Sequence, residues 1–205
     1  MSKAGTLYIV SAPSGAGKTT LVGALLKNMP DIKASISHTT RPMRPGEKEG
    51  VNYHFVSEEM FLSLINKEAF LEHAQVFNHF YGTSKEWVEK TLSEGIDVIL
   101  EIDWQGAEQI RDLIPESKSI FILPPSLEAL EERLIKRGQD DPTVIKRRLA
   151  AAKEEISHYM MADYLLINDG FDETLVEFNS IILHERLKLQ SQKQKNLNLL
   201  NSLLS

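Results

Sequence analysis

The sequence predicts an α/β fold, in which helices flank a parallel sheet on both faces. Short apolar runs of the kind found in strands buried on both faces recur along the chain, and helical patterns separate them. Strands that alternate with helices favour a parallel sheet. The expected strands are residues 6–11, 96–103, 119–123 and 164–167, and the expected helices lie at about residues 84–94, 105–113, 126–137 and 142–157.

The first expected strand leads into a glycine-rich turn at residues 12–17 and then into a further helix. This helix has apolar residues at Leu21, Val22 and Leu25 and is ended by Pro30. A strand, a turn and a helix in this order form the opening of an α/β unit.

Residues 32–83 differ from the chain on either side, because they combine short extended runs, one helix near residues 57–67 and polar turns. The extended runs are residues 32–37, 51–55 and 70–76. We therefore expect a small inserted lobe of mixed α/β structure at residues 32–83. The core would then comprise residues 1–31 and 84–187 and end in a helix that starts near Asp172, an expected N-cap.

The tail, residues 188–205, is rich in Gln, Asn, Lys and Leu. Leu199, Leu200, Leu203 and Leu204 partly suit a helical stripe. Two interpretations stay open: a frayed terminal helix, or a contact between copies of the chain that would make a homo-oligomer through the C-terminal helix or tail.

The composition excludes several classes of protein. The 205 residues carry a net charge of -6, so the surface as a whole does not attract nucleic acid or an anionic membrane. The chain has no cysteine, which excludes disulfides and thiolate metal sites. No apolar stretch approaches the length of about 20 residues that a membrane span needs. We expect a cytoplasmic protein with no nucleic-acid or membrane partner.

A phosphate-binding motif occupies the glycine-rich turn, after a buried strand and at the start of a helix, where such a loop must lie. Gly15 and Gly17 let the backbone curl so that N–H groups point inward and form an anion hole. Lys18 would bridge the β- and γ-phosphates of a nucleotide, and the Thr19 hydroxyl would hold Mg²⁺. The ATP-binding residues expected here are Ala12, Pro13, Ser14, Gly15, Ala16, Gly17, Lys18, Thr19 and Thr20.

The motif departs from the common pattern at Ala12, where a glycine is usual. Alanine tolerates the required backbone unless φ is positive there, so the change is mild. The alternative is a glycine-rich turn that binds nothing.

A first basic cluster lies at Arg41 and Arg44, in a segment that Pro42 and Pro45 hold extended. Arginine suits phosphate because its planar guanidinium binds two oxygens at once. The two side chains could converge on one phosphate, and the alternative is an ordinary solvated loop.

A second basic cluster lies on the helices at residues 126–137 and 142–157. Arg133 and Arg137 are four residues apart and share a helix face, whereas Arg148 lies near the apolar stripe of the next helix and Arg147 points nearly opposite. Arg133, Arg137 and Arg148 are therefore expected to reach inward from a helical lid at about residues 126–157. The alternative is surface charge paired with glutamates along each helix.

The order of these motifs resembles that of guanylate kinases. The segments that agree include the loop at residues 12–20, Ser37-x-x-Thr-Arg41-x-x-Arg44, Gly50-x-x-Tyr53, Glu72-x-Ala74, Tyr81-Gly82-Thr83, Glu101-Ile-Asp103-x-Gln105-Gly106 and Arg137-Gly138. The resemblance covers about residues 5–185 and leaves out the tail. It implies a P-loop kinase core with an inserted nucleotide-monophosphate-binding lobe and a helical lid.

The resemblance also implies roles for individual residues. The GMP phosphate would be bound by Ser37, Arg41, Arg44, Tyr53 and Tyr81; guanine would be read by Glu72, Thr83 and Asp103; Asn168 would lie near the base and ribose of ATP; and catalysis would depend on Lys18, Arg41, Arg133, Arg137 and Arg148.

Chemistry supports the guanine assignment, because a carboxylate such as Glu72 can accept both N1–H and N2–H₂ of guanine, a pair that adenine lacks. A hydroxyl such as that of Thr83 can serve O6. Without the resemblance, Glu72 could be a charge in an amphipathic stretch, and Asp103 and Asn168 could be turn residues.

The implied reaction is in-line transfer of a phosphoryl group from ATP to GMP, and we expect to dGMP, with Mg²⁺ and no covalent enzyme intermediate. Two other functions stay open. One is a guanylate-kinase-like module that binds a protein partner without catalysis, and the other is a kinase for a different small phosphate acceptor.

Overall fold

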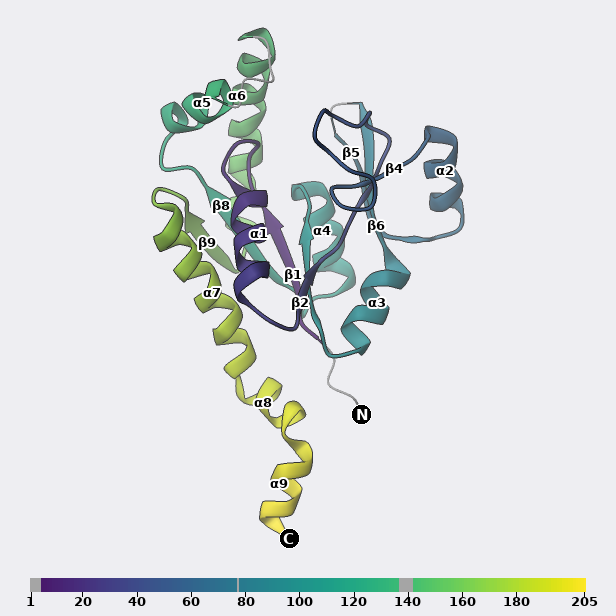
Figure 1. Ribbon diagram of the computed structural model, residues 1–205, viewed down its shortest axis with the longest axis vertical. Helices are drawn as coiled ribbons and strands as arrows, with labels where there is room; N and C mark the ends of the chain where they lie inside the picture. Colours follow the sequence, from purple (N-terminus) through teal and green to yellow (C-terminus); the bar gives the residue numbers. More distant parts are fainter. Residues whose placement is uncertain (1–4, 77, 137–141) are drawn as a thin grey trace.

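The computed structural model describes residues 5–76, 78–136 and 142–205. Its centre is a five-stranded sheet in the order β2-β7-β1-β8-β9, in which every pair of neighbouring strands is parallel (Figure 1). These strands are β1 (Leu7–Ser11), β2 (Ile32–Ala34), β7 (Asp97–Glu101), β8 (Lys118–Leu123) and β9 (Tyr164–Ile167). The parallel sheet confirms the expected α/β class.

Helices cover both faces of this sheet. Successive side chains of a strand point to opposite faces, so a central strand such as β1 contributes to two hydrophobic clusters. Tyr8 and Val10 of β1 pack with α1 (Lys18–Asn28) and α7 (Phe171–Leu187). Leu7 and Ile9 instead pack in a second cluster with residues of α3 (Lys85–Ser93) and α4 (Trp104–Leu113). The phosphate-loop segment therefore leaves a strand that is buried on both sides.

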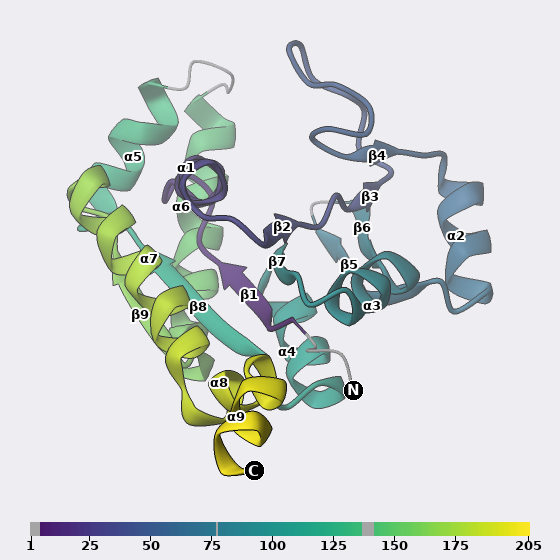
Figure 2. The same ribbon diagram turned by 60° about the horizontal axis from the view of Figure 1, so that its bottom comes forward.

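A second sheet of four strands stands beside the first, in the order β4-β3-β6-β5 (Figure 2). Its strands are β3 (His38–Thr39), β4 (His54–Phe55), β5 (Phe70–Val76) and β6 (His79–Ser84), and α2 (Glu58–Asn66) lies next to it. Strands β3 and β4 run parallel, whereas β6 is antiparallel to both β3 and β5. This sheet confirms the mixed lobe that the sequence predicts.

The beginning of the lobe differs from expectation. Residues 32–34 pair with β7 in the five-stranded sheet, so the core continues past residue 31 and the boundary lies later in the chain. Residues 79–84, which the sequence did not single out as extended, form β6 in the middle of the lobe sheet.

A pair of helices, α5 (Leu127–Lys136) and α6 (Pro142–Ser157), projects on the other side of the phosphate loop from the second sheet (Figure 1). The pair has a small core of its own, formed by Leu130, Leu134, Ile145 and Ala152. A 3₁₀ turn, η1 (His158–Met161), then leads to β9.

The N-cap of the C-terminal helix α7 lies two residues earlier than expected. Gly170 is its N-cap and makes no side-chain cap, while Asp172 lies in the first turn. The far end of α7 is pinned to the core, because Arg186 Nε donates to Asp97 Oδ2 at 2.8 Å and Asp97 Oδ1 accepts from the Thr6 N–H at 2.7 Å.

The tail forms two short helices, α8 (Leu189–Lys195) and α9 (Leu197–Leu204), that extend away from the rest of the chain (Figure 1). Exposed leucines gather on them, with Leu203 71% and Leu204 87% exposed. Along the described chain, no helix is both long and apolar enough to cross a membrane.

Candidate functional site

The phosphate loop has the backbone that its glycines predict. Gly15 and Gly17 have φ values of 98° and 97°, in the left-handed region that favours glycine. A Cβ on Gly17 would lie 2.4 Å from Nδ2 of Asn168, so a side chain is excluded there for a second reason. Ala12 is not among the described residues with positive φ, which explains why alanine is tolerated in place of the usual glycine.

Lys18 and Thr19 open the helix α1 directly after this loop. Lys18 Nζ donates to the Ile102 carbonyl oxygen at 3.3 Å, and Thr19 Oγ1 donates to Glu101 Oε2 at 2.9 Å. Burial lowers the pKa of Lys18, while the carboxylates of Glu101, Asp103 and Glu155 oppose that shift. The ammonium group therefore lies among carboxylates at the end of β7. It also lines the cavity, so a bound phosphate could contact the positive charge of Lys18.

A cavity of about 770 Å³ connects this loop to the second sheet. Its size suits a ligand site. The expected residues that line it are Ala12, Pro13, Ser14, Gly15, Gly17, Lys18, Thr19, Thr20, Ser37, Arg41, Arg44, Tyr53, Glu72, Tyr81, Asp103, Arg133 and Arg148. One cavity thus brings together residues from the loop, the lobe and the α5–α6 pair.

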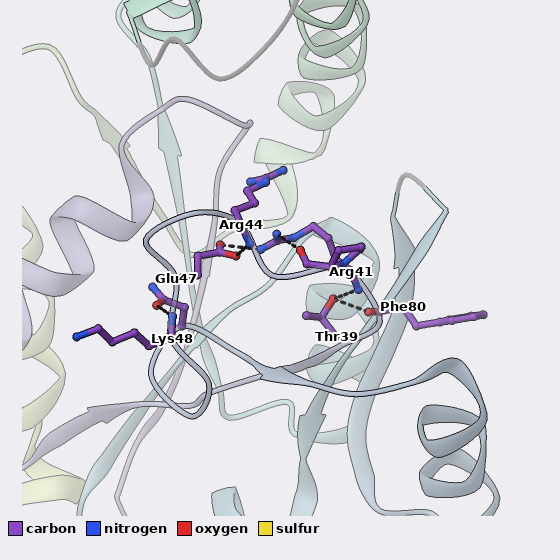
Figure 3. A network of polar contacts seen from close by, with 8 residues as sticks. Thr39, Arg41, Arg44, Glu47, Lys48 and Phe80 are labelled. Carbon is purple, nitrogen blue, oxygen red and sulfur yellow. Dashed lines mark hydrogen bonds and ion pairs between the residues drawn. The ribbon is translucent and has the colours of Figure 1, made fainter.

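The basic cluster of the lobe is built around Arg41 (Figure 3). Its Nη2 donates to Glu47 Oε1 at 2.7 Å, and the other carboxylate oxygen of Glu47 accepts from the Arg44 N–H at 2.7 Å. The Arg41 guanidinium also lies 5.4 Å from the ring centroid of Tyr53, which in turn meets Tyr81 edge to face. Arg41 is thereby fixed on the cavity wall with only 9% of its surface exposed.

Glu47 carries a negative charge in this cluster. Burial would raise its pKa, but the hydrogen bonds from Arg41 and from the Arg44 backbone outweigh burial and hold the pKa below the ordinary value. Glu47 therefore partly neutralises the cluster and orients the guanidinium, and an arriving phosphate would share those donors.

Glu72, on β5, is the most deeply buried acid on the cavity wall, at 3% exposure. Its Oε1 accepts from Thr83 Oγ1 at 2.6 Å. Burial raises the pKa of Glu72 to about 7, the nearby Asp103 carboxylate adds to the shift, and the Thr83 hydrogen bond opposes it. A carboxylate in this position can accept hydrogen bonds from a ligand that carries two adjacent donors.

Asp103 has a structural task as well as a place on the cavity. It is the N-cap of α4, and its Oδ1 accepts from the Gly106 N–H at 3.0 Å. Its second oxygen, Oδ2, accepts from Gln105 Nε2 at 3.1 Å. Asp103 is therefore both a turn residue, as one interpretation of the sequence holds, and a residue of the cavity wall.

Two of the three arginines expected to reach inward from the α5–α6 pair lie on the cavity wall. Arg133 and Arg148 line the cavity, whereas Arg147 is exposed away from it. Arg133 Nη2 donates to the Asn168 carbonyl oxygen at 2.8 Å. The expected partner Arg137 lies outside the described residues.

Three expected site residues lie behind the cavity wall instead of on it. Ala16 is fully buried in the loop, and Thr83 is fully buried behind Glu72. Asn168 is 6% exposed, and its Nδ2 donates to the Ala16 carbonyl oxygen at 2.7 Å. Asn168 thus supports the phosphate loop from behind, and its expected place near the ATP base and ribose stays a prediction.

Three acids on the cavity wall received no role from the sequence: Glu47, Glu101 and Glu155. Glu101 ends the buried strand β7, and ligand sites gather at the carboxyl ends of parallel strands. Its place at the end of a predicted strand could therefore have indicated a site residue. Glu155 lies seven residues after Arg148 on α6, a spacing that puts both side chains on one helix face.

A glycine-rich loop that joins a central parallel strand to a helix, and opens onto a large cavity, defines a P-loop nucleotide-binding protein. The family model for guanylate kinase matches residues 4–185. The chain belongs to the guanylate kinase family.

Individual relatives agree with this assignment over the whole chain. The chain is 64% identical to the guanylate kinase of Saccharophagus degradans over 205 residues, with 100% of both chains covered. It is 59% identical to the guanylate kinase of Vibrio cholerae over 203 residues, with 98% of each covered. Among solved structures, guanylate kinase from Anaplasma phagocytophilum matches with a TM-score of 0.78 and 35% identity, over 92% of this chain and 89% of that chain.

Proposed function

We propose that this protein transfers the γ-phosphoryl group of ATP to GMP, and to dGMP, and so forms a nucleoside diphosphate. The observation that carries the proposal is the single cavity between the phosphate loop and the Arg41 cluster. Two separate anion-binding groups on one cavity suit a reaction in which one phosphate is passed to another, because the two reactants must be held close and in line.

On the donor side, the loop N–H groups, the start of α1 and Lys18 would hold the triphosphate of ATP. Asn168 supports this side indirectly, through its hydrogen bond to the loop carbonyl of Ala16. Arg133 and Arg148 would lie over the transferring group and balance its charge, and Arg137 would join them.

Mg²⁺ fits the residues beside Lys18. The Thr19 hydroxyl and the Glu101 carboxylate it contacts form an all-oxygen set, which Mg²⁺ prefers. Among the described residues no group of three or more acidic, histidine or cysteine side chains could hold a metal unaided, so nucleotide phosphates would supply further ligands. When bound, the ion would neutralise charge on the β- and γ-phosphates.

On the acceptor side, Ser37, Arg41, Arg44, Tyr53 and Tyr81 would hold the GMP phosphate. Glu72 would accept both hydrogen-bond donors of guanine, and Asp103 would stand beside it. Thr83 would act by orienting Glu72, to which it is hydrogen-bonded at 2.6 Å. A buried polar site discriminates strongly, because a base without matching donors leaves the carboxylate unpaired.

In this proposal the second sheet is a GMP-binding lobe and the α5–α6 pair is a lid, and closure of both would exclude water from the transfer. The GMP phosphate is already anionic, so the reaction requires no strong general base. We infer a cytoplasmic location from the lack of cysteine and from the substrates. A homo-oligomer formed through the tail stays a prediction.

A coupled assay with ATP, Mg²⁺ and each of GMP, AMP, UMP and dTMP tests the proposal. We expect diphosphate formation with GMP and at most traces with the other three. Binding of GMP without turnover would instead favour a binding module, and faster turnover of another acceptor would favour a different kinase.

A further inference from the structure

Gly106, in the first turn of α4, lies against the carboxylate of Glu72. A Cβ added to Gly106 would lie 2.6 Å from Glu72 Oε2 and 3.2 Å from Glu72 Cδ. The next atom it would meet is Ile102 Cδ1, at 3.3 Å. An oxygen at 2.6 Å from a methyl carbon is far inside van der Waals contact, so the carboxylate would have to retreat by roughly 0.8 Å.

Glu72 has little freedom to retreat without losing its present orientation. The residue is 3% exposed and its Oε1 is hydrogen-bonded to Thr83, which is fully buried. A methyl group at residue 106 would therefore turn or shift the carboxylate relative to the cavity.

The backbone gives no reason for glycine at this position. Gly106 is not among the described glycines with positive φ, and it lies inside a helix, where alanine is more stable than glycine by up to about 1 kcal/mol. Its N–H donates to Asp103 Oδ1, a hydrogen bond that any residue except proline could make. What glycine alone provides is the space that the Glu72 carboxylate occupies.

We propose that Gly106 is a positioning residue for guanine recognition: its missing side chain lets the Glu72 carboxylate stand at the cavity wall in the orientation that accepts the two guanine donors. This inference rests on the proposed function. It adds a specificity determinant that never touches the nucleotide and acts only through Glu72.

The test compares Gly106→Ala with Gly23→Ala. Gly23 lies in α1, and a Cβ there would meet nothing within 4 Å, so this control adds the same methyl group to a helix without a clash. We expect Gly106→Ala to reduce kcat/KM for GMP about 10- to 100-fold, mainly through KM, because small displacements of a positioned group have effects of this size. The Kd of Gly106→Ala for ATP should stay close to wild type. Gly23→Ala should keep wild-type kinetics with both nucleotides, and its melting temperature should equal or exceed that of wild type, because alanine is the better helix former.

A double-mutant cycle separates positioning from a general structural effect. In a Glu72→Ala background there is no carboxylate to displace, so Gly106→Ala should change kcat/KM for GMP less than twofold. An equal loss in both backgrounds would overturn the proposal, and so would a Gly106→Ala enzyme that uses GMP like wild type. If the wild-type protein itself failed to use GMP, the proposed function would fail first, and that result is distinguishable from either outcome.

Discussion

The carboxylate of Glu155, on α6, accepts a hydrogen bond from the backbone N–H of Ser14 in the phosphate loop at 3.2 Å. The two residues are separated by 141 positions in the sequence. Burial raises the pKa of Glu155, while the Ser14 hydrogen bond and the charge of Lys18 oppose that shift. The contact links the loop that would hold ATP to the helix that carries Arg148.

Loss of the hydrogen bond between Ser14 and Glu155 should weaken the use of ATP, because it removes a support of the phosphate loop. We expect Glu155→Ala to lower kcat/KM for ATP about tenfold, the effect of one hydrogen bond to a charged group. Glu155→Gln, whose amide oxygen can still accept from Ser14, should keep most of the activity. The exposed neighbour Glu154 provides the control, and steady-state kinetics in which Glu154→Ala and Glu155→Ala behaved alike would contradict the role of the contact.

Lys18 should be essential to transfer but not to folding. We expect Lys18→Ala to reduce kcat at least 10²-fold, because its charge acts where negative charge develops. Lys27, exposed on the same helix, is the matched control. Circular dichroism should show both variants folded, and near-normal GDP formation by Lys18→Ala would rule out the assigned role.

Arg148 and Arg147 test the lid with two adjacent residues. Arg148 lines the cavity and Arg147 is exposed, so Arg148→Ala should lower kcat at least tenfold while Arg147→Ala should leave it nearly unchanged. The measurement is kcat at saturating ATP and GMP. The reverse order of effects would show that α6 presents a different face during the reaction.

Asn168 distinguishes a brace for the loop from a base contact. If it acts through the Ala16 carbonyl, Asn168→Ala should weaken ATP and GTP binding by the same factor, because both nucleotides place the same phosphates in the loop. A contact with the base would instead change the ratio of the two Kd values. Isothermal titration with each nucleotide decides between them.

The buried Glu72 should leave a signature in the pH dependence of stability. Its pKa is raised from 4.5 to about 7, so between these values the folded protein retains a proton that the unfolded chain has released. The free energy of unfolding therefore falls as pH rises through that window and levels off above it, by on the order of 3 kcal/mol from this group.

Glu72→Gln should lack this decline. In urea titrations, the stability of Glu72→Gln relative to wild type should increase from about pH 5 to about pH 7 and then stay constant. A difference in unfolding free energy that did not change with pH would show that Glu72 keeps an ordinary pKa in the folded protein.

The sequence predicts the features of this protein that local pattern encodes. The apolar runs give the strands of the five-stranded sheet, although the sequence places the run at residues 32–37, which contains β2, in the lobe. The glycine and lysine spacing gives the phosphate loop, in which Gly15 and Gly17 have positive φ. The helical periodicity of α6 correctly separates Arg148 from Arg147. In each case the pattern that predicts the feature lies within one short segment of the sequence.

What escaped prediction depends on contacts between distant segments. The three residues of β2 join the core because they pair with β7, and nothing local to residues 32–34 reveals that partner. Asn168 donates a hydrogen bond to the Ala16 carbonyl oxygen across 152 positions, a contact that no local pattern around either residue reveals. The crowding of Gly106 against Glu72 likewise appears only once β5 and α4 are packed together.

The anchoring of α7 through Arg186 sets where the chain can be shortened. A protein ending before Arg186 would leave the Asp97 carboxylate, 2% exposed, without its cation, a loss of about 3 to 5 kcal/mol for a buried pair. A protein ending after Asn196 would retain that ion pair and the hydrogen bond from Gln192 to the Arg186 carbonyl, and would lose only the leucine-rich α9. An affinity tag or a fused partner can therefore replace the last nine residues at little cost to folding.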